Sequence, residues 1–341
     1  MSVDEATRVI DEADPPDPGA PRGIWARLVT AALGLAVAGL GLFVVVRLLG
    51  WDGFTPLAQL MSFTPYLVPV AVLLVLVVAA MRRWRTGIAA GLVAGVLVAL
   101  VAPRAIGGEA PLPAGGVPLR VMTANLWHGN ATDELMALVR REQPDLLSIQ
   151  ECTQESLAAL EAAGLRELLP YVAARPRPGV AGTALYGRAA FIGLRTSDPE
   201  SRFDMARART VHRGVTLDVV AAHPTPPVPY GDAVTDWRTE LSRLPRPDRD
   251  DAVVSLLAGD LNATLDHAPL RRLLATGYTD AADAIGEGLA VTWQAGWVPA
   301  VTIDHILVED GTGVRAVRVH RVGGSDHRAV VADLTLPSAA P

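Results

Sequence analysis

Three long apolar runs near the N-terminus constrain the fold of this 341-residue chain more than any other feature. They extend over Leu28–Val46, Tyr66–Met81 and Gly87–Ala102, and none contains a charged residue. Because a bilayer core about 30 Å thick needs about 20 residues of helix, the runs predict membrane spans. A cleavable signal peptide would give one such run, and the alternative structure is a buried hydrophobic hairpin in a soluble domain. We expect a three-helix transmembrane region over residues 23–103.

The arginines around these runs predict the orientation of the spans. Arg22 and Arg27 flank the first run, and the RRWR sequence at 82–85 separates the second from the third. The loop between the first two runs holds only Arg47. By the positive-inside rule, the N-terminal tail and the 82–85 loop face the cytoplasm. We therefore expect a multi-pass protein of the cell membrane whose C-terminal domain is extracytoplasmic.

The rest of the chain divides by composition. Residues 1–22 are acidic and rich in proline and alanine, which predicts a disordered cytoplasmic tail. Residues 104–118 are rich in glycine and proline, which predicts a linker. In residues 119–337, strand-like runs alternate with helical patterns. This alternation predicts an α/β domain in which two sheets pack face to face with helices outside.

Charge and cysteine content exclude several classes of function. The formal net charge of −6 provides no overall basic field that would attract nucleic acid. The single cysteine, Cys152, excludes an internal disulfide and a cysteine-cluster metal site. It follows an apolar strand-like run, so we interpret it as a small buried hydrophobic residue.

The apolar pattern predicts the elements of the C-terminal domain. The predicted strands are 119–125, 145–151, 190–194, 215–223, 252–258, 301–308, 314–322 and 327–336. The predicted helices are 131–143, 153–163, 232–244 and 267–276.

Polar residues stand where these apolar runs stop or break. They are Asn125, Glu151, His223, Asp260, Asn262, Asp304, His305, Ser325, Asp326 and His327. Each has an ordinary structural explanation, since Asn and Asp form turns and Glu151 could cap the following helix. Together they supply carboxylates, carboxamides and imidazoles. Because strand ends at one rim bring distant residues together, we expect them to form a site.

This set of side chains suits a hard cation and a phosphate. Oxygen ligands such as Glu151 favour Mg²⁺ or Mn²⁺. The carboxamides of Asn125 and Asn262 can orient phosphate oxygens without adding negative charge, and an imidazole paired with a carboxylate makes a general base near neutral pH. Asp260 and Asn262 are two residues apart and so point to one side of an extended chain. We interpret them as parts of one phosphoryl centre.

The motifs, in their order, resemble the endonuclease/exonuclease/phosphatase superfamily of metal-dependent phosphoesterases. This superfamily includes DNase I-like nucleases, inositol-phosphate phosphatases and neutral sphingomyelinases. The matching motifs, within residues 119–337, are VMTANLW, LLSIQE, VVAAHPTPP, AGDLNAT, TW, TIDHILV and GSDHRAVVADL. The resemblance implies a four-layer α/β sandwich as the catalytic domain. It also implies in-line attack of water on phosphorus, with a metal ion stabilising the developing charge.

The resemblance implies a role for each matching residue around the metal and the phosphate. Glu151 would ligate Mg²⁺ or Mn²⁺, with Asn125 beside it on the substrate side. Asp326 would lie close to the metal. Asn262 would hold the phosphate.

The resemblance also implies the residues that act on protons. Asp260 would orient or deprotonate the attacking water. His327 would be the second histidine of the site, with Asp304 holding its imidazole. His223 matches the other histidine, which is a phosphate contact or a leaving-group acid in relatives.

The substrate class stays open between several phosphoesters. The segment 170–213 is rich in arginine, which indicates either an anion-binding rim or a solvated face. Aromatic residues make up only 5% of the chain, which favours a phospholipid, a lipid-linked or a small soluble phosphoester over DNA. No sequence feature indicates a protein partner.

Two functions of other classes compete with the phosphoesterase. One is an inactive domain that binds or senses phosphorylated ligands on a membrane anchor, which the complete set of motif residues disfavours. The other is a transporter, which the absence of charged residues from the apolar runs disfavours.

Overall fold

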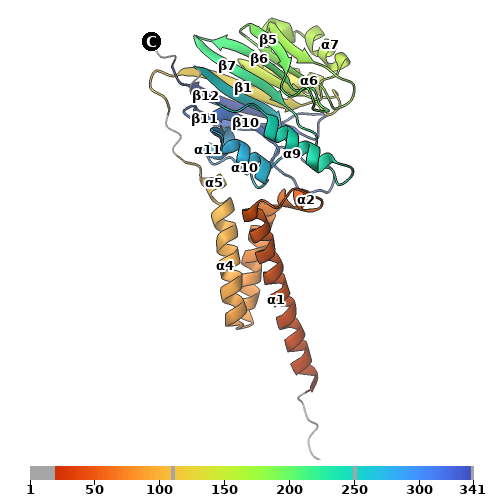
Figure 1. The fold of residues 1–341 in the computed structure, drawn as a ribbon, viewed down its shortest axis with the longest axis vertical. Helices are drawn as coiled ribbons and strands as arrows, with labels where there is room; N and C mark the ends of the chain where they lie inside the picture. Colours follow the sequence, from red (N-terminus) through yellow and green to blue (C-terminus); the bar gives the residue numbers. More distant parts are fainter. Residues whose placement is uncertain (1–19, 109–111, 249–251, 339–341) are drawn as a thin grey trace, which may run out of the picture.

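The computed structural model describes residues 20–108, 112–248 and 252–338. An α/β domain sits at one end of a stalk of three helices (Figure 1). The predicted tail, residues 1–22, lies almost wholly outside the described residues, and so does the middle of the predicted linker, 104–118.

The stalk consists of the helices α1 (Ala20–Leu49), α3 (Thr64–Ala80) and α4 (Trp84–Val101). Two of them, α1 and α4, are long and apolar enough to cross a membrane, whereas α3 has 17 residues and falls short of that length. Only 11% and 22% of the most apolar windows of α1 and α4 are buried. The described chain therefore does not cover them as a soluble domain covers a core helix. Two candidate spans are found, and the third predicted span is not confirmed.

The α/β domain contains two six-stranded sheets. The first has the order β11-β12-β1-β2-β4-β3. Its strands are β1 (Val117–Asn125), β2 (Leu146–Gln150), β3 (Tyr171–Arg175), β4 (Thr183–Gly187), β11 (Gly313–Arg321) and β12 (Arg328–Leu336). The second has the order β5-β6-β7-β8-β10-β9. Its strands are β5 (Phe191–Thr196), β6 (Ala206–His212), β7 (Val215–Ala222), β8 (Val253–Asp260), β9 (Tyr278–Asp280) and β10 (Asp304–Glu309).

Helices cover the outer face of each sheet and complete four layers. The helices α6 (Thr132–Glu142) and α7 (Gln154–Ala162) share an apolar cluster with the first sheet. The helices α9 (Ala233–Arg243) and α10 (Ala268–Leu274) do so with the second sheet. Short helices lie in connections: α2 (Leu57–Met61), α5 (Pro103–Ile106), α8 (Leu165–Leu168) and α11 (Ala281–Ala284). The predicted α/β sandwich is confirmed.

The apolar strand sequences explain why the sheets pack face to face. A central cluster joins residues of both sheets, among them Val121 of β1, Leu217 of β7 and Leu256 of β8, each at most 1% exposed. Seven of the eight residues of β8 are buried, as expected for a strand covered on both faces. Polar contacts also join the two sheets, such as the hydroxyl of Ser148, which donates to the carbonyl of Ala258 at 2.7 Å.

Strand directions bring the polar strand ends to one edge. β1 runs parallel to β2, and β7 runs parallel to β8, so all four strands finish there. β10 runs antiparallel to β8, and β12 antiparallel to β1, so these two strands begin there. The approach of β7 to β8 requires glycine at 259, because a Cβ on Gly259 would lie 1.9 Å from the carbonyl oxygen of Ala222.

Buried ion pairs fix the stalk to the domain. Asp266 is fully buried and accepts hydrogen bonds from Arg47, at the end of α1, and from Arg104, in α5. The three nitrogen–oxygen distances are 2.7, 2.7 and 2.8 Å. In the loop after α1, the carboxylate of Asp52 also accepts from the backbone N–H of Ala268 at 2.5 Å. The segment predicted as a linker thus includes a short helix and a buried arginine.

Candidate active site

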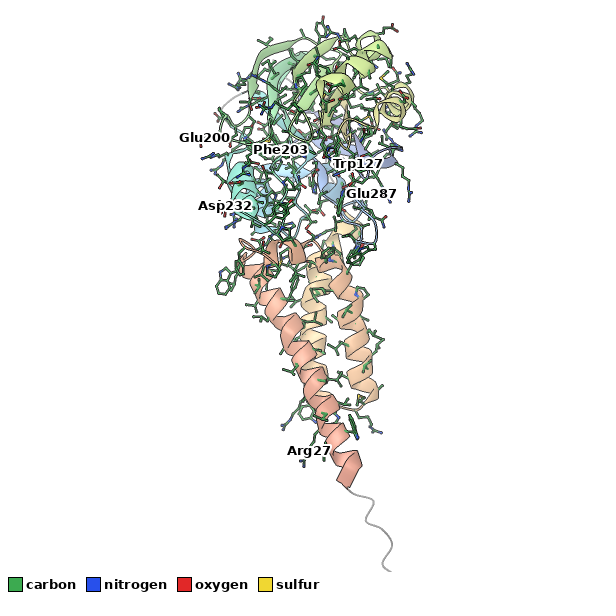
Figure 2. The ribbon with its side chains drawn as sticks, turned by 90° about the vertical axis from the view of Figure 1, so that its right-hand side faces the viewer. Arg27, Trp127, Glu200, Phe203, Asp232 and Glu287 are labelled. Atoms are coloured by element: carbon green, nitrogen blue, oxygen red, sulfur yellow. The ribbon has the colours of Figure 1, made fainter. Side chains whose placement is uncertain are left out.

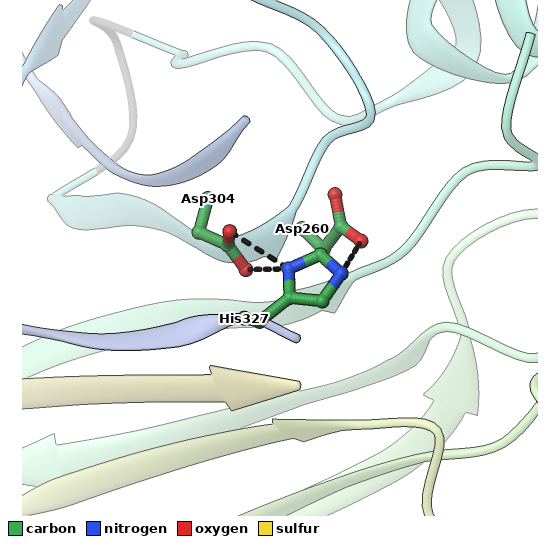
Figure 3. Close-up of side chains that lie close together, drawn as sticks. All are labelled: Asp260, Asp304 and His327. Atoms are coloured by element: carbon green, nitrogen blue, oxygen red, sulfur yellow. Dashed lines mark hydrogen bonds and ion pairs between the residues drawn. The ribbon is translucent and has the colours of Figure 1, made fainter. Parts of the chain in front are cut away.

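Two carboxylates and one imidazole meet at the shared strand edge: Asp260, Asp304 and His327 (Figure 3). Asp304 opens β10 directly opposite Asp260, the last residue of β8, so their side chains leave the sheet on the same face. Nδ1 of His327 lies 2.9 Å from Oδ2 and 3.1 Å from Oδ1 of Asp304. Nε2 of His327 lies 3.6 Å from Oδ2 of Asp260. Asp304 therefore orients the ring with Nε2 toward Asp260.

The amide of Asn125 connects two carboxylates. Its Nδ2 donates to Asp260 Oδ2 at 3.1 Å and to Glu151 Oε1 at 3.2 Å, and its Oδ1 accepts from the backbone N–H of Trp127 at 2.9 Å. An amide nitrogen has two N–H donors, and both are used here. Asn125 is buried and lies behind the cavity described below. It holds Glu151 and Asp260 at a fixed separation.

His223 and Asn262 also approach the carboxylate of Asp260. His223 follows β7, and its Nε2 is 3.7 Å from Oδ2 of Asp260. Asn262 donates its backbone N–H to Oδ1 of Asp260 at 2.8 Å, and its Nδ2 donates to the carbonyl of Pro224 at 3.0 Å. One N–H of the Asn262 amide therefore stays available for a ligand.

Asp326 is held beside His327 by residues of two loops. Its Oδ2 accepts from the indole N–H of Trp293 at 2.9 Å. Ser325 joins this loop to β1, because its hydroxyl donates to the carbonyl of Asn125 at 2.8 Å and accepts from the backbone N–H of His327 at 3.0 Å. Oδ1 of Asp326 is buried and has no hydrogen-bond partner within the described part of the chain.

The backbone around these residues adopts conformations that favour glycine. φ is +45° at Trp127, +59° at His128, +56° at Glu151 and +49° at Asn262. Such conformations are energetically unfavourable for residues with a side chain, and they occur where the surrounding structure imposes them. The turn at 127–128 directs the backbone N–H of His128 to Oε2 of Glu151 at 2.5 Å.

The helix-cap explanation of Glu151 does not hold. Helix α7 is capped by Thr153, whose side chain accepts from the backbone N–H of Ser156 while the Ser156 hydroxyl accepts from the N–H of Thr153. The carboxylate of Glu151 points instead to Asn125 and His128.

His305 is the strand-end residue that does not join the site. It is buried between Asp280 and the carbonyl of Ala263.

Burial and mutual charge shift the pKa values of three residues. Burial alone would lower the pKa of His327, but the charges of Asp304 and Asp260 outweigh it and raise the pKa to about 10. Burial raises the pKa of Asp260 to about 7. Burial, and then the charge of His327, lower the pKa of His223 to about 3. The cluster thus combines one neutral and one readily protonated imidazole.

The carboxylates at this edge fit a divalent cation. Glu151 and Asp326 both line the cavity, and Oδ1 of Asp326 accepts no hydrogen bond within the described residues, although Nε2 of His327 lies 3.9 Å from it. Asp260, Asp304 and His327 also bring one ligand atom each within 4.8 Å of one another. A cation on those three would compete with the hydrogen bond between Asp304 and His327.

The site opens into a cavity of about 590 Å³. Six of the eight candidate residues line it: Glu151, His223, Asp260, Asn262, Asp326 and His327. Its other walls are mainly apolar and are built by Phe63, Trp127, Val180, Phe203, Pro226, Pro227, Val228, Pro229, Trp293, Val298, Val301 and Ile303. Trp127 and Phe203 lie at similar heights above the stalk in Figure 2. The lining of the cavity therefore combines the polar site residues, which form its polar end, with a wall that is mainly apolar.

The arginines of segment 170–213 do not form a rim around this cavity. Six of them form ion pairs with carboxylates: Arg177, Arg188, Arg195, Arg202, Arg207 and Arg209. Among the described residues, no arginine lines the cavity. This arrangement agrees with the solvated-face interpretation of the segment.

Sequence reasoning missed several residues that shape the site. Trp293 lies inside the quoted TW motif, so its spacing to Asp304 and His327 carried a signal. Phe203 lies in the arginine-rich segment and has no such signal. The same holds for Gln59 and Phe63, which reach the cavity from the connection between α1 and α3.

Comparison with known proteins identifies relatives of the α/β domain. Residues 122–327, more than half of the chain, match the Endonuclease/Exonuclease/phosphatase family. No curated protein matches the chain.

Solved structures share the fold at low sequence identity. D. rerio TDP2 in complex with a single-strand DNA product has a TM-score of 0.52 at 14% identity, over 64% of this chain and 98% of that one. A variant of the 3′ phosphatase NExo from Neisseria, bound to a product DNA hairpin, has a TM-score of 0.51 at 19% identity, over 63% and 98%. Truncated Caenorhabditis elegans TDP2 has a TM-score of 0.51 at 16% identity, over 66% and 100%.

Proposed function

The chain belongs to the endonuclease/exonuclease/phosphatase family, and on that premise we propose that it is a membrane-anchored, extracytoplasmic phosphoesterase that depends on Mg²⁺ or Mn²⁺. Members of this family hydrolyse phosphoric esters. The observation that carries the proposal is the arrangement of Asp260, Asp304 and His327 at the polar end of an open cavity.

The Asp260–His327 pair would activate the attacking water. Nε2 of His327 and Oδ2 of Asp260 are 3.6 Å apart, too far for a strong direct hydrogen bond and close enough for a water molecule to contact both. The pair would hold that water in line with phosphorus, and Asp260 would take up its proton as the new P–O bond forms, because His327 is already protonated near neutral pH. Asp304 would keep the imidazole of His327 in this orientation throughout the reaction.

The neighbouring polar residues would bind the phosphate. The free N–H of the Asn262 amide would donate to a phosphoryl oxygen. His223 also faces Asp260, and because its lowered pKa keeps the imidazole neutral, we assign it a contact with a phosphoryl oxygen rather than proton donation to the departing oxygen. Asn125 would act on the substrate indirectly, by holding Glu151 and Asp260 in place.

Glu151 and Asp326 would hold the divalent cation. When bound, such an ion would stabilise the negative charge that develops on the phosphoryl oxygens. Oxygen ligands of this kind suit Mg²⁺ and Mn²⁺, which bind to few carboxylates and retain several waters.

The stalk supports a membrane location. α1 and α4 are candidate spans by length and hydropathy. α3 has 17 residues, fewer than either candidate span, and Arg82 and Arg83 lie in the turn between α3 and α4, with Arg85 in the first turn of α4. Figure 2 shows Arg27 near the end of α1 that is far from the α/β domain. Three spans with both arginine groups in the cytoplasm would place the site outside it.

Hydrolysis by the full chain in lipid nanodiscs tests the proposal. The panel contains a generic phosphodiester, a generic monoester, sphingomyelin, an inositol phosphate and DNA, the last because the TDP2 and NExo structures contain DNA products. We expect turnover of at least one ester that EDTA abolishes, that Mg²⁺ or Mn²⁺ restores and that His327→Ala lowers by roughly 10²-fold or more. Binding of these esters without turnover would contradict it and favour an inactive sensing domain.

A further inference from the structure

One wall of the active-site cavity comes from the connection between the stalk helices α1 and α3 rather than from the α/β domain. We call it the stalk wall. Gln59 of α2, and Ser62 and Phe63 just after it, line the same cavity as Asp260 and His327. Phe63 directly precedes α3, so it lies where the candidate membrane region meets the domain. The catalytic residues and the start of a stalk helix therefore share one cavity.

Two hydrogen bonds hold this wall against the loops of the domain. Nε2 of Gln59 donates to the carbonyl of Pro227 at 2.5 Å. The hydroxyl of Tyr66, in the first turn of α3, donates to the carbonyl of Ala300 at 2.7 Å. Pro227 also lines the cavity, and so does Val298, two residues before Ala300. The stalk segment is thus a built part of the cavity, not a chance neighbour.

Exposed aromatic side chains occur in the same connection and beside the cavity residue Val298. Trp51 and Phe54, in the connection between α1 and α2, are 61% and 57% exposed. Trp297 is 92% exposed and directly precedes the cavity residue Val298. Large aromatic side chains are enriched where membrane proteins meet the interface between lipid and water. Their place where the stalk meets the domain supports a membrane surface at this level of the molecule (Figure 1).

We propose that the substrate is a membrane lipid whose phosphoester group reaches Asp260 and His327 while its apolar chain lies against Phe63 and Val298. This inference rests on the proposed phosphoesterase function and names its substrate class. A polar end beside an apolar wall matches an amphiphile. The absence of arginine from the cavity lining, within the described residues, provides no cationic track for a polyanion such as DNA.

A series of esters that differ only in their alkyl chain tests this inference. The substrates are methyl, butyl and hexyl p-nitrophenyl phosphate, which share one scissile bond and one leaving group. The full chain is assayed in nanodiscs with Mg²⁺, and release of nitrophenolate gives kcat/KM for each ester. We expect the ratio of kcat/KM for hexyl over methyl to be about tenfold or more, because apolar groups that leave water favour binding.

Variants connect the chain-length preference to the stalk wall. Phe63→Ala should lower the hexyl-to-methyl ratio several-fold, whereas Phe63→Leu, which keeps an apolar wall, should retain most of it. Tyr171→Ala removes an exposed aromatic side chain of β3 that does not line the cavity, and it should leave the ratio unchanged. The ratio is independent of the folded fraction of each preparation.

The outcomes separate this inference from the function on which it rests. No hydrolysis of any ester would contradict the proposed phosphoesterase. Hydrolysis with a ratio near one would retain the phosphoesterase and overturn the lipid substrate. A high ratio that Phe63→Ala leaves unchanged would overturn the role of the stalk wall, since the preference would then arise elsewhere.

Discussion

Oδ2 of Asp304 lies 2.9 Å from Nδ1 of His327, and this contact directs the opposite ring nitrogen toward Asp260. Asp304→Asn keeps the shape but replaces the charged acceptor. We expect kcat to fall by roughly 10²-fold or more with a smaller change in KM, because the orientation of the imidazole is lost. Steady-state kinetics on the best ester of the panel would measure this.

A second buried aspartate–histidine pair provides the matched control. Oδ2 of Asp280 lies 2.6 Å from Nδ1 of His305, and neither residue lines the cavity. Asp280→Asn should therefore lower stability while leaving kcat per folded molecule near its original value. Equal losses of kcat in the two variants would indicate a structural role for Asp304.

Glu151→Gln should weaken metal activation. The substitution keeps the size of the side chain and removes its negative charge, so we expect the half-saturating Mg²⁺ concentration to rise about tenfold or more. Glu142→Gln is the control, because Glu142 is also largely buried but pairs with Arg318 away from the cavity. An unchanged Mg²⁺ titration in Glu151→Gln would refute the ligand role.

Asp266→Asn should loosen the attachment of the stalk. The substitution leaves the buried guanidinium groups of Arg47 and Arg104 without a counter-charge, which lowers the free energy of unfolding by about 3–5 kcal/mol. Chemical denaturation of the full chain in detergent measures this. Asp333→Asn breaks more exposed pairs with Arg120 and Arg318 and should change the same free energy by less than about 1 kcal/mol.

The same carboxylate predicts how stability depends on pH. Burial alone would raise the pKa of Asp266, but the hydrogen bonds and charge of Arg104, with the charge of Arg47, lower it below the ordinary value of 3.8. The contribution of charged Asp266 to the free energy of unfolding is therefore complete above the pKa of this group in the unfolded chain. It is lost as the pH falls through the lowered pKa of the folded protein. We expect the stability difference between the wild type and Asp266→Asn to be constant near neutral pH and to shrink below about pH 4. A difference that shrinks at neutral pH would contradict this assignment.

Reporter fusions test the predicted orientation. A fluorescent protein that matures only in the cytoplasm should stay dark when fused after Pro341, and alkaline phosphatase fused there should be active. The same two reporters fused after Arg83, truncating the chain in the 82–85 turn, should give the opposite result. Fluorescence of the Pro341 fusion would overturn the extracytoplasmic location.

The sequence predicted the polar strand ends because buried strands and the residues that follow them leave a local signal. Asp260 and Asn262 stand out after an apolar run, and parallel strand directions then bring such ends together. β6 was harder to predict, although Ala206 and Ala208 are buried and alternate with the more exposed Arg207 and Arg209. Buried and more exposed residues alternate along this strand, but the two arginines and the small size of the buried alanines concealed the pattern.

Contacts between distant segments could not be predicted from local pattern. Gln59 and Pro227 are 168 residues apart, and nothing near either residue indicates that they meet. The pairing of Arg104 with Asp266 is similar, since glycine and proline around Arg104 predict a linker and the tertiary contact buries it. Such contacts depend on how complete elements dock, which a residue's immediate neighbours do not determine.

The attachment of the stalk through Arg47, Asp266 and Arg104 has a kinetic consequence. In the proposed membrane location, a domain attached in this way would not swing away from the bilayer, and its site would stay at one height above the lipid. For a lipid substrate, the reaction rate would then depend on the mole fraction of substrate in the bilayer and not on its concentration per volume of solution. Dilution of the substrate with inert lipid would slow the reaction even when the total amount per volume is held constant.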